Sequence, residues 1–445
     1  MAVPAVLRNR DFNLYWAGVV LSQIGTRGTV AANYFQVYAL TGSVLQTGLV
    51  GAGQAVALIV LSPIGGAYAD RLDRRKLLMW AQVVSLVVAV VLAVLTLTGQ
   101  AQAWHVILSV LFTTAAATFD QPARQALIPA MVPKHQLAQA IALLNPSREV
   151  AVLVGPALAG VFIAVGGPGL MYAVDAVTYA VLIGVLAVLR VAPLVQAGPP
   201  RSVFGSVVEG ARYVLKRPLV TRLMALDLAA TVFGAYRVLL PALALDVLSV
   251  GPTGYGLLSS APSAGALLAT YVIFRVVARS NRLGRIVLAS TALYGIAAIF
   301  LAQSRWFPLA LVAALLLGAL DAMATTIRHA AVQVDTPDDI RGRVTAFYQM
   351  SSRGGPAIGD LLMGAFAGVV GPIAALTIGG LGPVLVAAAF RARPNVVREY
   401  TSASVPEPDV PAPEEPQAGG TRTQANSSRT TVIRRRSRSG DRTRD

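Results

Sequence analysis

Long apolar stretches recur along the chain, and only short polar breaks separate them. Each stretch holds roughly 20 residues, the length of α-helix that crosses a hydrocarbon core of about 30 Å. The pattern predicts an all-α membrane protein with twelve transmembrane helices. The predicted spans are residues 12–40, 46–69, 76–98, 103–127, 136–165, 168–190, 219–248, 254–278, 286–303, 306–333, 342–367 and 369–391.

An internal repeat divides these spans into two sets of six. Shifting the chain by about 204 to 209 residues places Gly25 on Gly234 and Gly160 on Gly364. Repeats of this kind are typical of transporters built from two related bundles. We therefore expect two pseudo-symmetric six-helix bundles. Their predicted limits are 1–190 and 219–391.

Two further segments lie outside the predicted bundles. Residues 191–218 place apolar side chains at helical spacing between charged ones, which predicts a cytoplasmic linker with an amphipathic helix on the membrane surface. Residues 392–445 are rich in Pro, Glu, Ser, Thr and Arg, a composition that cannot bury a core and that predicts a disordered cytoplasmic tail. The basic end of that tail either rests on anionic lipid or is a solvated anchor.

Basic residues gather in alternate loops between the spans. Arg8 and Arg10 precede the first span, whereas the turns at residues 41–46 and 99–103 carry no basic residue. Basic loops remain on the cytoplasmic side, so both termini are expected in the cytoplasm. Arginine far exceeds lysine, and Ala, Val, Leu and Gly dominate, which is typical of bacterial genes rich in GC. We therefore expect a multi-pass protein of a bacterial inner membrane.

Composition excludes several other functions. The net charge of +16 lies in loops and tail rather than on a folded basic face, so we expect no nucleic-acid partner. The chain has no cysteine, and its three histidines are far apart in sequence, so no metal site is expected. Neither a phosphate-binding Gly-x-x-x-x-Gly-Lys-Ser/Thr loop nor a nucleophile motif occurs. We expect no enzyme activity, no cofactor and no use of ATP.

The loop between the second and third spans carries a dense set of small and charged residues. Its sequence from Gly66 is Gly-Ala-Tyr-Ala-Asp-Arg-Leu-Asp-Arg-Arg-Lys-Leu-Leu. Gly66 permits close helix packing, and Asp70 can accept hydrogen bonds from the N-terminus of a neighbouring helix. Nearby arginines can hold that carboxylate and the lipid surface. We expect this loop to act as a gate latch through Gly66, Asp70, Arg71, Arg74 and Arg75.

The same loop closely resembles a motif of the major facilitator superfamily. That motif reads Gly-x-Leu-Ala-Asp-Arg-x-Gly-Arg-Arg-x-x-Leu, and Tyr68 and Asp73 replace its Leu and second Gly. The related stretch of the second half, residues 278–285, keeps basic residues but lacks the acid. Only the first-half latch is therefore expected to be strong.

Other segments resemble one branch of that superfamily, which holds the enterobactin exporter and macrolide and multidrug efflux proteins. The resemblance covers residues 8–391 and is carried by segments 8–16, 119–129, 155–160, 175–179 and 209–213. It implies export driven by an ion gradient, usually of protons. It also implies a central cavity lined by the first, fifth, seventh and eleventh spans.

Charged side chains near the middle of several spans mark candidate binding groups, because charge is costly there. Arg27 and Arg237 hold nearly equivalent positions in the two halves. Arginines outnumber acids, which favours an anionic or oxygen-rich ligand held by bidentate hydrogen bonds. Alternatively, the acids simply neutralise the arginines between helices. The predicted substrate-binding residues are Arg27, Asn33, Gln36, Arg148, Arg237, Gln349 and Arg353.

The polar uncharged residues allow two interpretations. Amides such as Asn33 and Gln36 can bond a ligand or join one helix to another. The tyrosines Tyr34, Tyr236 and Tyr348 are interpreted as lipid-facing or interfacial.

Acidic residues supply the candidates for proton coupling and gating. For Glu149, burial disfavours the charge while the neighbouring Arg148 favours it, a balance that transport could tip. Glu149 and Asp360 are the predicted proton-coupling residues, whereas Asp175 and Asp227 are expected to form structural pairs. Two further acid and arginine pairs complete the predicted gate: Asp120 with Arg124, and Asp321 with Arg328.

Together these features predict a secondary active transporter. We expect proton-coupled efflux of a small molecule, siderophore-like or antibiotic, by alternating access. The expected partners are that small molecule, protons and the lipid bilayer, and the chain is expected to be a monomer. Two alternatives stay open: an importer on the same fold, and a transport-inactive membrane scaffold.

Overall fold

The computed structural model describes residues 5–61, 73–189, 203–337, 340–392 and 396–401. Within these ranges the chain forms helices joined by turns, with no strand. The elements in chain order are η1 (Ala5–Arg8), α1 (Arg10–Thr41), α2 (Val44–Val56), η2 (Ala57–Leu61), α4 (Arg74–Leu97), α5 (Ala103–Met131), η3 (Lys134–Gln136), α6 (Leu137–Val188), α7 (Val203–Leu215), α8 (Pro218–Phe233), η4 (Arg237–Leu239), α9 (Leu240–Ala242), η5 (Leu243–Val247), α10 (Gly251–Arg279), α11 (Leu283–Gln303), α12 (Phe307–Val334), α13 (Arg341–Val370), α14 (Pro372–Ala392) and α15 (Val396–Glu399).

Eight helical segments in the described residues are long and apolar enough to cross a membrane. The longest, Lys134–Val188, would measure about 80 Å as one helix, far more than a bilayer core. It is interrupted at Gly166 and Gly167, whose backbone angles are not helical, and Gly167 has φ +74°. The interruption falls between the fifth and sixth predicted spans. The apolar helix containing α2 is shorter, and α1 and α13 include several polar residues.

Local sequence signals fix where the helices begin and end. The Asn9 side chain accepts hydrogen bonds from the backbone N–H groups of Asp11 and Phe12, which caps α1. Gly42 ends α1 in the left-handed conformation, with φ +61°. Asp73, one of the two departures from the superfamily motif, accepts a hydrogen bond from the Arg75 backbone N–H. Its carboxylate therefore caps α4 where the motif has glycine.

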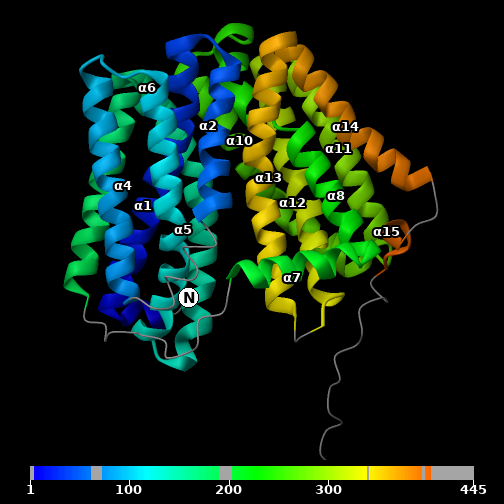
Figure 1. Cartoon of the computed structure of the whole chain (residues 1–445), viewed down its shortest axis with the longest axis horizontal. Coiled ribbons are helices and arrows are strands. Elements are labelled where there is room, and N and C mark those ends of the chain that lie inside the picture. The colour runs from blue at the N-terminus through cyan, green and yellow to red at the C-terminus, as the bar shows by residue number, and fades with distance from the viewer. Residues whose placement is uncertain (1–4, 62–72, 190–202, 338–339, 393–395, 402–445) are drawn as a thin grey trace, which may run out of the picture. The chain divides into compact units, whose positions relative to one another are not determined.

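For description we divide the chain into an N-terminal half (residues 5–189) and a C-terminal half (residues 218–401). In Figure 1, α1, α2, α4 and α5 lie together at the left, and α8, α11, α12 and α14 lie together at the right. Between the halves, α2 packs on α13 and α6 packs on α10. The largest apolar core contains buried residues of both halves, such as Tyr38 and Leu239.

Glycines allow the closest contacts between the halves. A Cβ added to Gly364 of α13 would lie 2.6 Å from the Cα of Gly48 in α2. A Cβ added to Gly160 of α6 would lie 2.8 Å from the Cα of Gly256 in α10. Gly160 and Gly364 are the pair that the sequence repeat superposes. Repeat-related glycines therefore make equivalent helix contacts, where only a residue without a side chain fits.

The helix ends fall into two groups, which we call the basic end and the far end. The basic end holds the arginine-rich turns. There, the Asn9 amide donates to the Met131 carbonyl, and the Arg75 guanidinium donates to the Leu186 carbonyl at 2.7 Å. The far end holds the opposite turns, at residues 41–44, 98–103, 166–168, 248–251, 304–306 and 370–372, of which 304–306 carries Arg305.

Two short elements pack on the C-terminal half at the basic end. In α7, the Glu209 carboxylate pairs with Arg343 of α13 at 2.5 Å, and the Tyr213 hydroxyl donates to the Asp335 carbonyl. The helix α15 lies inside the segment predicted to be a disordered tail. Its Val397 is buried with Tyr400 in an apolar cluster of this half, so the predicted boundary at residue 392 is wrong. The tail from residue 402 onward lies outside the described residues.

Candidate transport site

A buried carboxylate lies where the two halves meet. Asp360 of α13 is 3 % exposed and accepts a 2.7 Å hydrogen bond from the Tyr34 hydroxyl of α1. It also accepts a hydrogen bond from the backbone N–H of Val238 in η4. The site is tight, because a Cβ added to Gly51 of α2 would lie 2.8 Å from the Asp360 Cβ. Four elements from both halves therefore enclose one acidic side chain.

Arg237 stands beside this carboxylate. The helix α8 ends at Phe233, and the chain resumes as the short 3-10 helix η4, which begins at Arg237. Arg237 therefore lies directly after a break in the helix. It interacts electrostatically with Asp360. Its side chain is exposed, although Tyr236 and Val238 on either side are buried. A guanidinium that is both accessible and next to a buried acid is suited to bind an anionic or oxygen-rich group.

A second hydrogen bond of the same kind lies one helical turn farther along α1. The Tyr38 hydroxyl donates to the Asp246 carboxylate of η5, and the Tyr255 hydroxyl of α10 donates to the Ala31 carbonyl at 2.8 Å. Residues 31–38 of α1 therefore bond three elements of the C-terminal half towards the far end. We call Tyr34, Tyr38, Arg237, Asp246 and Asp360 the seam cluster.

Sequence reasoning singled out two residues of the seam cluster and misjudged the burial of a third. Asp360 and Arg237 were predicted from their depth in the spans. The interpretation of Tyr34, Tyr236 and Tyr348 as lipid-facing was wrong, because each is 7 % exposed or less. Asp246 was not predicted. The signal in the sequence was an acidic residue near the end of an apolar run, with no basic residue within one helical turn to pair with it.

The other predicted binding residues are spread over several environments. Gln36 is buried and its amide donates to the Thr96 hydroxyl of α4, so it joins helices of one half. Asn33 is buried, and its side-chain oxygen has no hydrogen-bond partner among the described residues. Arg27 of α1 packs against Gly155 of α6, because a Cβ added to Gly155 would lie 2.6 Å from the Arg27 Cβ.

The two predicted residues of α6 differ in burial, and one of them is not buried as expected. Arg148 is half-buried, whereas Glu149 is exposed. The burial on which the proton hypothesis for Glu149 depended is therefore absent. In α13, Gln349 is exposed, and the side chain of Arg353 lies outside the described part of the structure.

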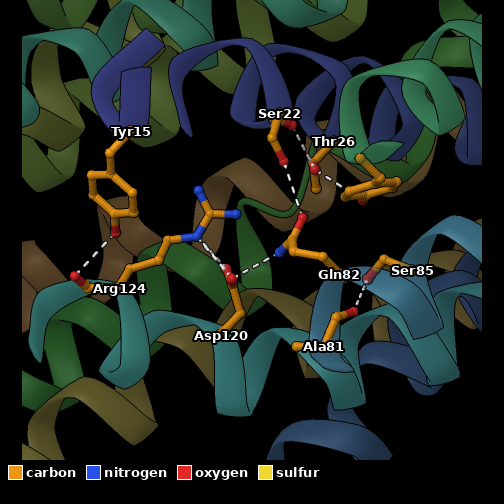
Figure 2. A network of polar contacts seen from close by, with 9 residues as sticks. Tyr15, Ser22, Thr26, Ala81, Gln82, Ser85, Asp120 and Arg124 are labelled. Carbon is orange, nitrogen blue, oxygen red and sulfur yellow. Dashed lines mark hydrogen bonds and ion pairs between the residues drawn. The ribbon is translucent and has the colours of Figure 1, made fainter. Parts of the chain in front are cut away.

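The basic end of the N-terminal half contains the predicted pair of Asp120 and Arg124. Their ion pair spans 2.7 Å within α5, as the four-residue spacing predicts. Figure 2 shows how the network continues. The Gln82 amide of α4 donates to Asp120 at 2.8 Å and accepts from the Ser22 hydroxyl of α1 at 3.4 Å. The Tyr15 hydroxyl bonds the Arg124 carbonyl.

The corresponding network of the C-terminal half is built differently. Arg328 of α12 is wholly buried and donates to the Asp227 carboxylate of α8 at 2.6 Å. The predicted partner, Asp321, is 3.8 Å away and half-exposed. Asp227 is thus the closer partner, and the pair joins two helices.

The predicted latch is described only in part. Gly66, Asp70 and Arg71 lie outside the described residues. Arg74 begins α4, and Arg75 donates to the carbonyls of Leu186 and Ala187 at the end of α6. The side chain of Arg75 therefore joins α4 to α6.

Comparison with known proteins agrees with this architecture. Residues 2–421 match the transmembrane secretion effector family. The enterobactin exporter EntS of Salmonella choleraesuis (strain SC-B67) is 27% identical over 352 residues, which cover 79% of this chain and 84% of that protein. The EntS protein of Citrobacter koseri is 28% identical over 353 residues, with the same coverage.

Two solved structures share the fold at low sequence identity. A structure of the nucleoside transporter NupG aligns with a TM-score of 0.69 and 13% identity, and covers 86% of this chain and 98% of that one. A POT family transporter in complex with a thioalcohol conjugated peptide aligns with a TM-score of 0.67 and 12% identity, over 86% and 96% of the two chains. The chain is a multi-pass membrane transporter of the major facilitator superfamily and belongs to its transmembrane secretion effector family.

Proposed function

We propose that the chain crosses the inner membrane twelve times as two six-helix bundles. The N-terminal bundle consists of α1, α2 with η2, α4, α5 and the two parts of α6 on either side of Gly166. The C-terminal bundle consists of the segment from α8 to η5 and of α10, α11, α12, α13 and α14. The equivalent contacts of Gly160 and Gly364 support this symmetry. The basic end faces the cytoplasm, because basic loops resist translocation.

The protein exports a small molecule by alternating access, driven by protons. The main support is the seam cluster, in which hydroxyls of α1 bond acidic side chains of the C-terminal half towards the far end. Bonds that cross from one half to the other hold only while the halves are together at that level. Rocking of the halves would break them and open the far end.

The substrate is a small molecule that presents anionic or oxygen-rich groups. Arg237 is exposed at mid-span, and its guanidinium can bind carboxylates and other anionic oxygen groups through paired hydrogen bonds. We propose Arg27 of α1 and Arg148 of α6 as further binding groups for the same ligand. The enterobactin exporters among the relatives suggest a siderophore-like compound, and we extend that substrate class to this chain.

Proton coupling would act on the seam cluster through Asp360. When Asp360 is ionised, it accepts hydrogen bonds from Tyr34 and from Val238 and interacts with Arg237. A proton on this carboxyl would remove its attraction to the guanidinium and weaken the hydrogen bonds that it accepts from Tyr34 and Val238, so the contact between the halves would loosen. Proton entry would then favour opening of the far end, through which the ligand leaves.

Transport by purified protein in lipid vesicles tests this function. Enterobactin is the probe, and an imposed pH gradient is the driving force. We expect enterobactin to move towards the compartment from which protons enter, and Arg237→Gln to lose most of this movement. Thr270→Val is the matched control, because Thr270 is exposed and bonds only a carbonyl of its own helix.

The outcomes separate the alternatives. Movement of enterobactin in the same direction as protons would indicate an importer. A protein that inserts correctly but moves no enterobactin under either gradient would indicate a scaffold or a different substrate class. Full transport by inserted Arg237→Gln protein would rule out the proposed ligand role.

A further inference from the structure

A second buried carboxyl group lies inside the N-terminal half, away from the seam cluster. Asp175 of α6 is 0 % exposed and faces α1. The Thr29 hydroxyl of α1 donates to its Oδ2 atom at 2.6 Å. The backbone of α1 comes equally close, because a Cβ added to Gly25 would lie 2.4 Å from the Asp175 Oδ1 atom.

Hydroxyl groups surround Asp175 in the described part of the structure. Among the described residues, no arginine or lysine acts on this carboxyl, and its side-chain partners are Thr29, Thr178 and Tyr179. The helix α4 also packs on α6, and its buried polar side chains have other partners: Ser85 bonds its own helix and Gln82 bonds Asp120. An ionised carboxylate buried without a cation is strongly disfavoured and normally takes up a proton.

The single hydroxyl hydrogen of Thr178 also favours a protonated Asp175. The Thr178 hydroxyl lies 2.8 Å from the Asp175 carbonyl oxygen and 3.1 Å from its Oδ1 atom. A threonine hydroxyl carries one hydrogen, so it donates to only one of these acceptors. If it donates to the nearer carbonyl, the contact with Oδ1 lacks a hydrogen unless the carboxyl group supplies it. A protonated Asp175 satisfies both contacts.

The hydroxyl of Tyr179 is committed elsewhere. The Thr26 hydroxyl donates to the Ser22 carbonyl at 2.8 Å. Its contact with the Tyr179 hydroxyl, 2.9 Å long, therefore uses the hydrogen of Tyr179. Tyr179 then has no hydrogen left to give to Asp175, and can only accept one. An ionised Asp175 therefore has Thr29 as a side-chain donor, and gains Thr178 as a second one only if Thr178 gives up its bond to the Asp175 carbonyl.

We propose that Asp175 is a proton-binding site of the N-terminal half and that it holds its proton in this conformation. The protonated carboxyl accepts from Thr29 through Oδ2 and donates from Oδ1 to Thr178. Removing the proton leaves a charge between α1 and α6 with no cation beside it among the described residues, held by Thr29 and by Thr178 only if Thr178 leaves the Asp175 carbonyl. The two helices must then separate or admit water, which changes how α1 packs on α6.

The use of this site in export rests on the proposed function. Thr26 and Ser22 lie on the same helix as Thr29, and Ser22 bonds Gln82, which bonds Asp120 at the basic end, as Figure 2 shows. A shift of α1 caused by loss of the Asp175 proton would therefore reach the network around Asp120. Asp175 would couple proton binding to the shape of the N-terminal half, separately from Asp360.

Infrared spectroscopy of the purified protein tests the proton directly. A protonated carboxyl and a carboxylate absorb in different regions. We expect the wild-type minus Asp175→Asn difference spectrum to contain a protonated carboxyl band that persists at neutral pH. Thr178→Val should shift this band, because it removes the acceptor of the carboxyl hydrogen. Carboxylate bands in its place at neutral pH would overturn the proposal.

Two further variants keep the test decisive. If Asp175→Asn does not fold, the band is assigned by its shift in Thr178→Val and in Thr29→Val, each compared with Thr270→Val. A protonated band that shifts in neither variant would not come from Asp175, and the proposal would be wrong.

Vesicle transport then tests the coupling. The amide introduced by Asp175→Asn resembles the neutral acid, so this variant should exchange enterobactin between equal concentrations at the wild-type rate. The same variant should lose the acceleration by a pH gradient. Wild-type acceleration in Asp175→Asn would overturn the coupling role. If wild-type protein moves no enterobactin at all, the proposed function fails, while the infrared band still decides whether Asp175 holds a proton.

Discussion

The two halves of the molecule use equivalent arginines in different ways. Arg124 and Arg328 are 204 residues apart, the offset that superposes Gly160 on Gly364. Arg124 pairs with Asp120 in its own helix, and its side chain is 13 % exposed. Arg328 is 1 % exposed and pairs with Asp227, which belongs to another helix. The same position is therefore a local pair in one half and a link between helices in the other.

This difference predicts which half yields more easily at the basic end. In the C-terminal half, a buried ion pair ties α8 to α12, and separating it would expose two unpaired charges to an apolar interior. In the N-terminal half, α1, α4 and α5 are joined through Ser22 and Gln82 by neutral or singly charged hydrogen bonds, which cost less to break. We expect α1 and α4 to shift relative to α5 more readily than α8 shifts relative to α12.

Loss of the Arg328 guanidinium should have the largest effect on stability. Arg328→Met leaves Asp227 buried without its cation, which typically costs about 3–5 kcal/mol. We expect a large drop in the unfolding temperature of detergent-solubilised protein, measured by intrinsic fluorescence. The double variant Asp227→Asn with Arg328→Met should recover much of the loss, because no lone charge remains. A single variant as stable as wild type would contradict the proposed link between α8 and α12.

How much of this arrangement follows from sequence depends on the distance between partners along the chain. The pair of Asp120 and Arg124 was predicted because four residues make one helical turn, so the spacing alone puts both side chains on one face. The break in α6 was likewise visible in the glycines at 166 and 167. Helix lengths, caps and the internal repeat are local or periodic features, so the sequence alone can predict them.

Pairs between helices were missed for a physical reason. Asp227 and Arg328 are 101 residues apart, and Tyr34 and Asp360 are 326 apart. Which helix faces meet is decided by the packing of small residues such as Gly48 and Gly364, not by the spacing of the polar groups themselves. The depth of Asp360 in its span made it a candidate functional residue, whereas its partner Tyr34 resembled many interfacial tyrosines.

A methyl group at Gly25 or Gly234 should have the next largest effect on stability. It also tests whether the equivalent position has a different role in each half. These two glycines are related by the repeat. A Cβ at Gly25 would lie 2.4 Å from Asp175 and 2.6 Å from Thr178, whereas at Gly234 it would lie 2.4 Å from the Tyr294 ring. Each alanine variant should cost about 1–3 kcal/mol by overpacking, measured by thermal unfolding.

The two variants should differ in spectroscopy. Gly25→Ala should also shift the carboxyl infrared band of Asp175, because it displaces the groups around that side chain. Gly234→Ala should leave the band in place. An equal effect of both variants on the band would mean that the band reports overall packing and not the contact between Gly25 and Asp175.

Breaking the pair at Arg124 should cost less than breaking that at Arg328. Arg124→Gln leaves Asp120 partly exposed and still bonded by the Gln82 amide, so we expect a loss of about 1–2 kcal/mol in thermal unfolding. Gln82→Leu in the same background should add to the loss, because Asp120 would then have neither donor. If Arg124→Gln destabilises the protein as much as Arg328→Met, the two halves do not differ as proposed.

The smallest effect is expected for the ion pair that joins α7 to the C-terminal half. Glu209 and Arg343 have exposed side chains, at 54% and 39%, and exposed pairs contribute less than about 1 kcal/mol. Glu209→Gln should therefore change the unfolding temperature very little, and the change should vanish at high salt because ions screen exposed charges. Arg328→Met should keep its effect at high salt, because its pair is buried. A large, salt-independent effect of Glu209→Gln would show instead that α7, like the pair of Asp227 and Arg328, is a main support of the C-terminal half.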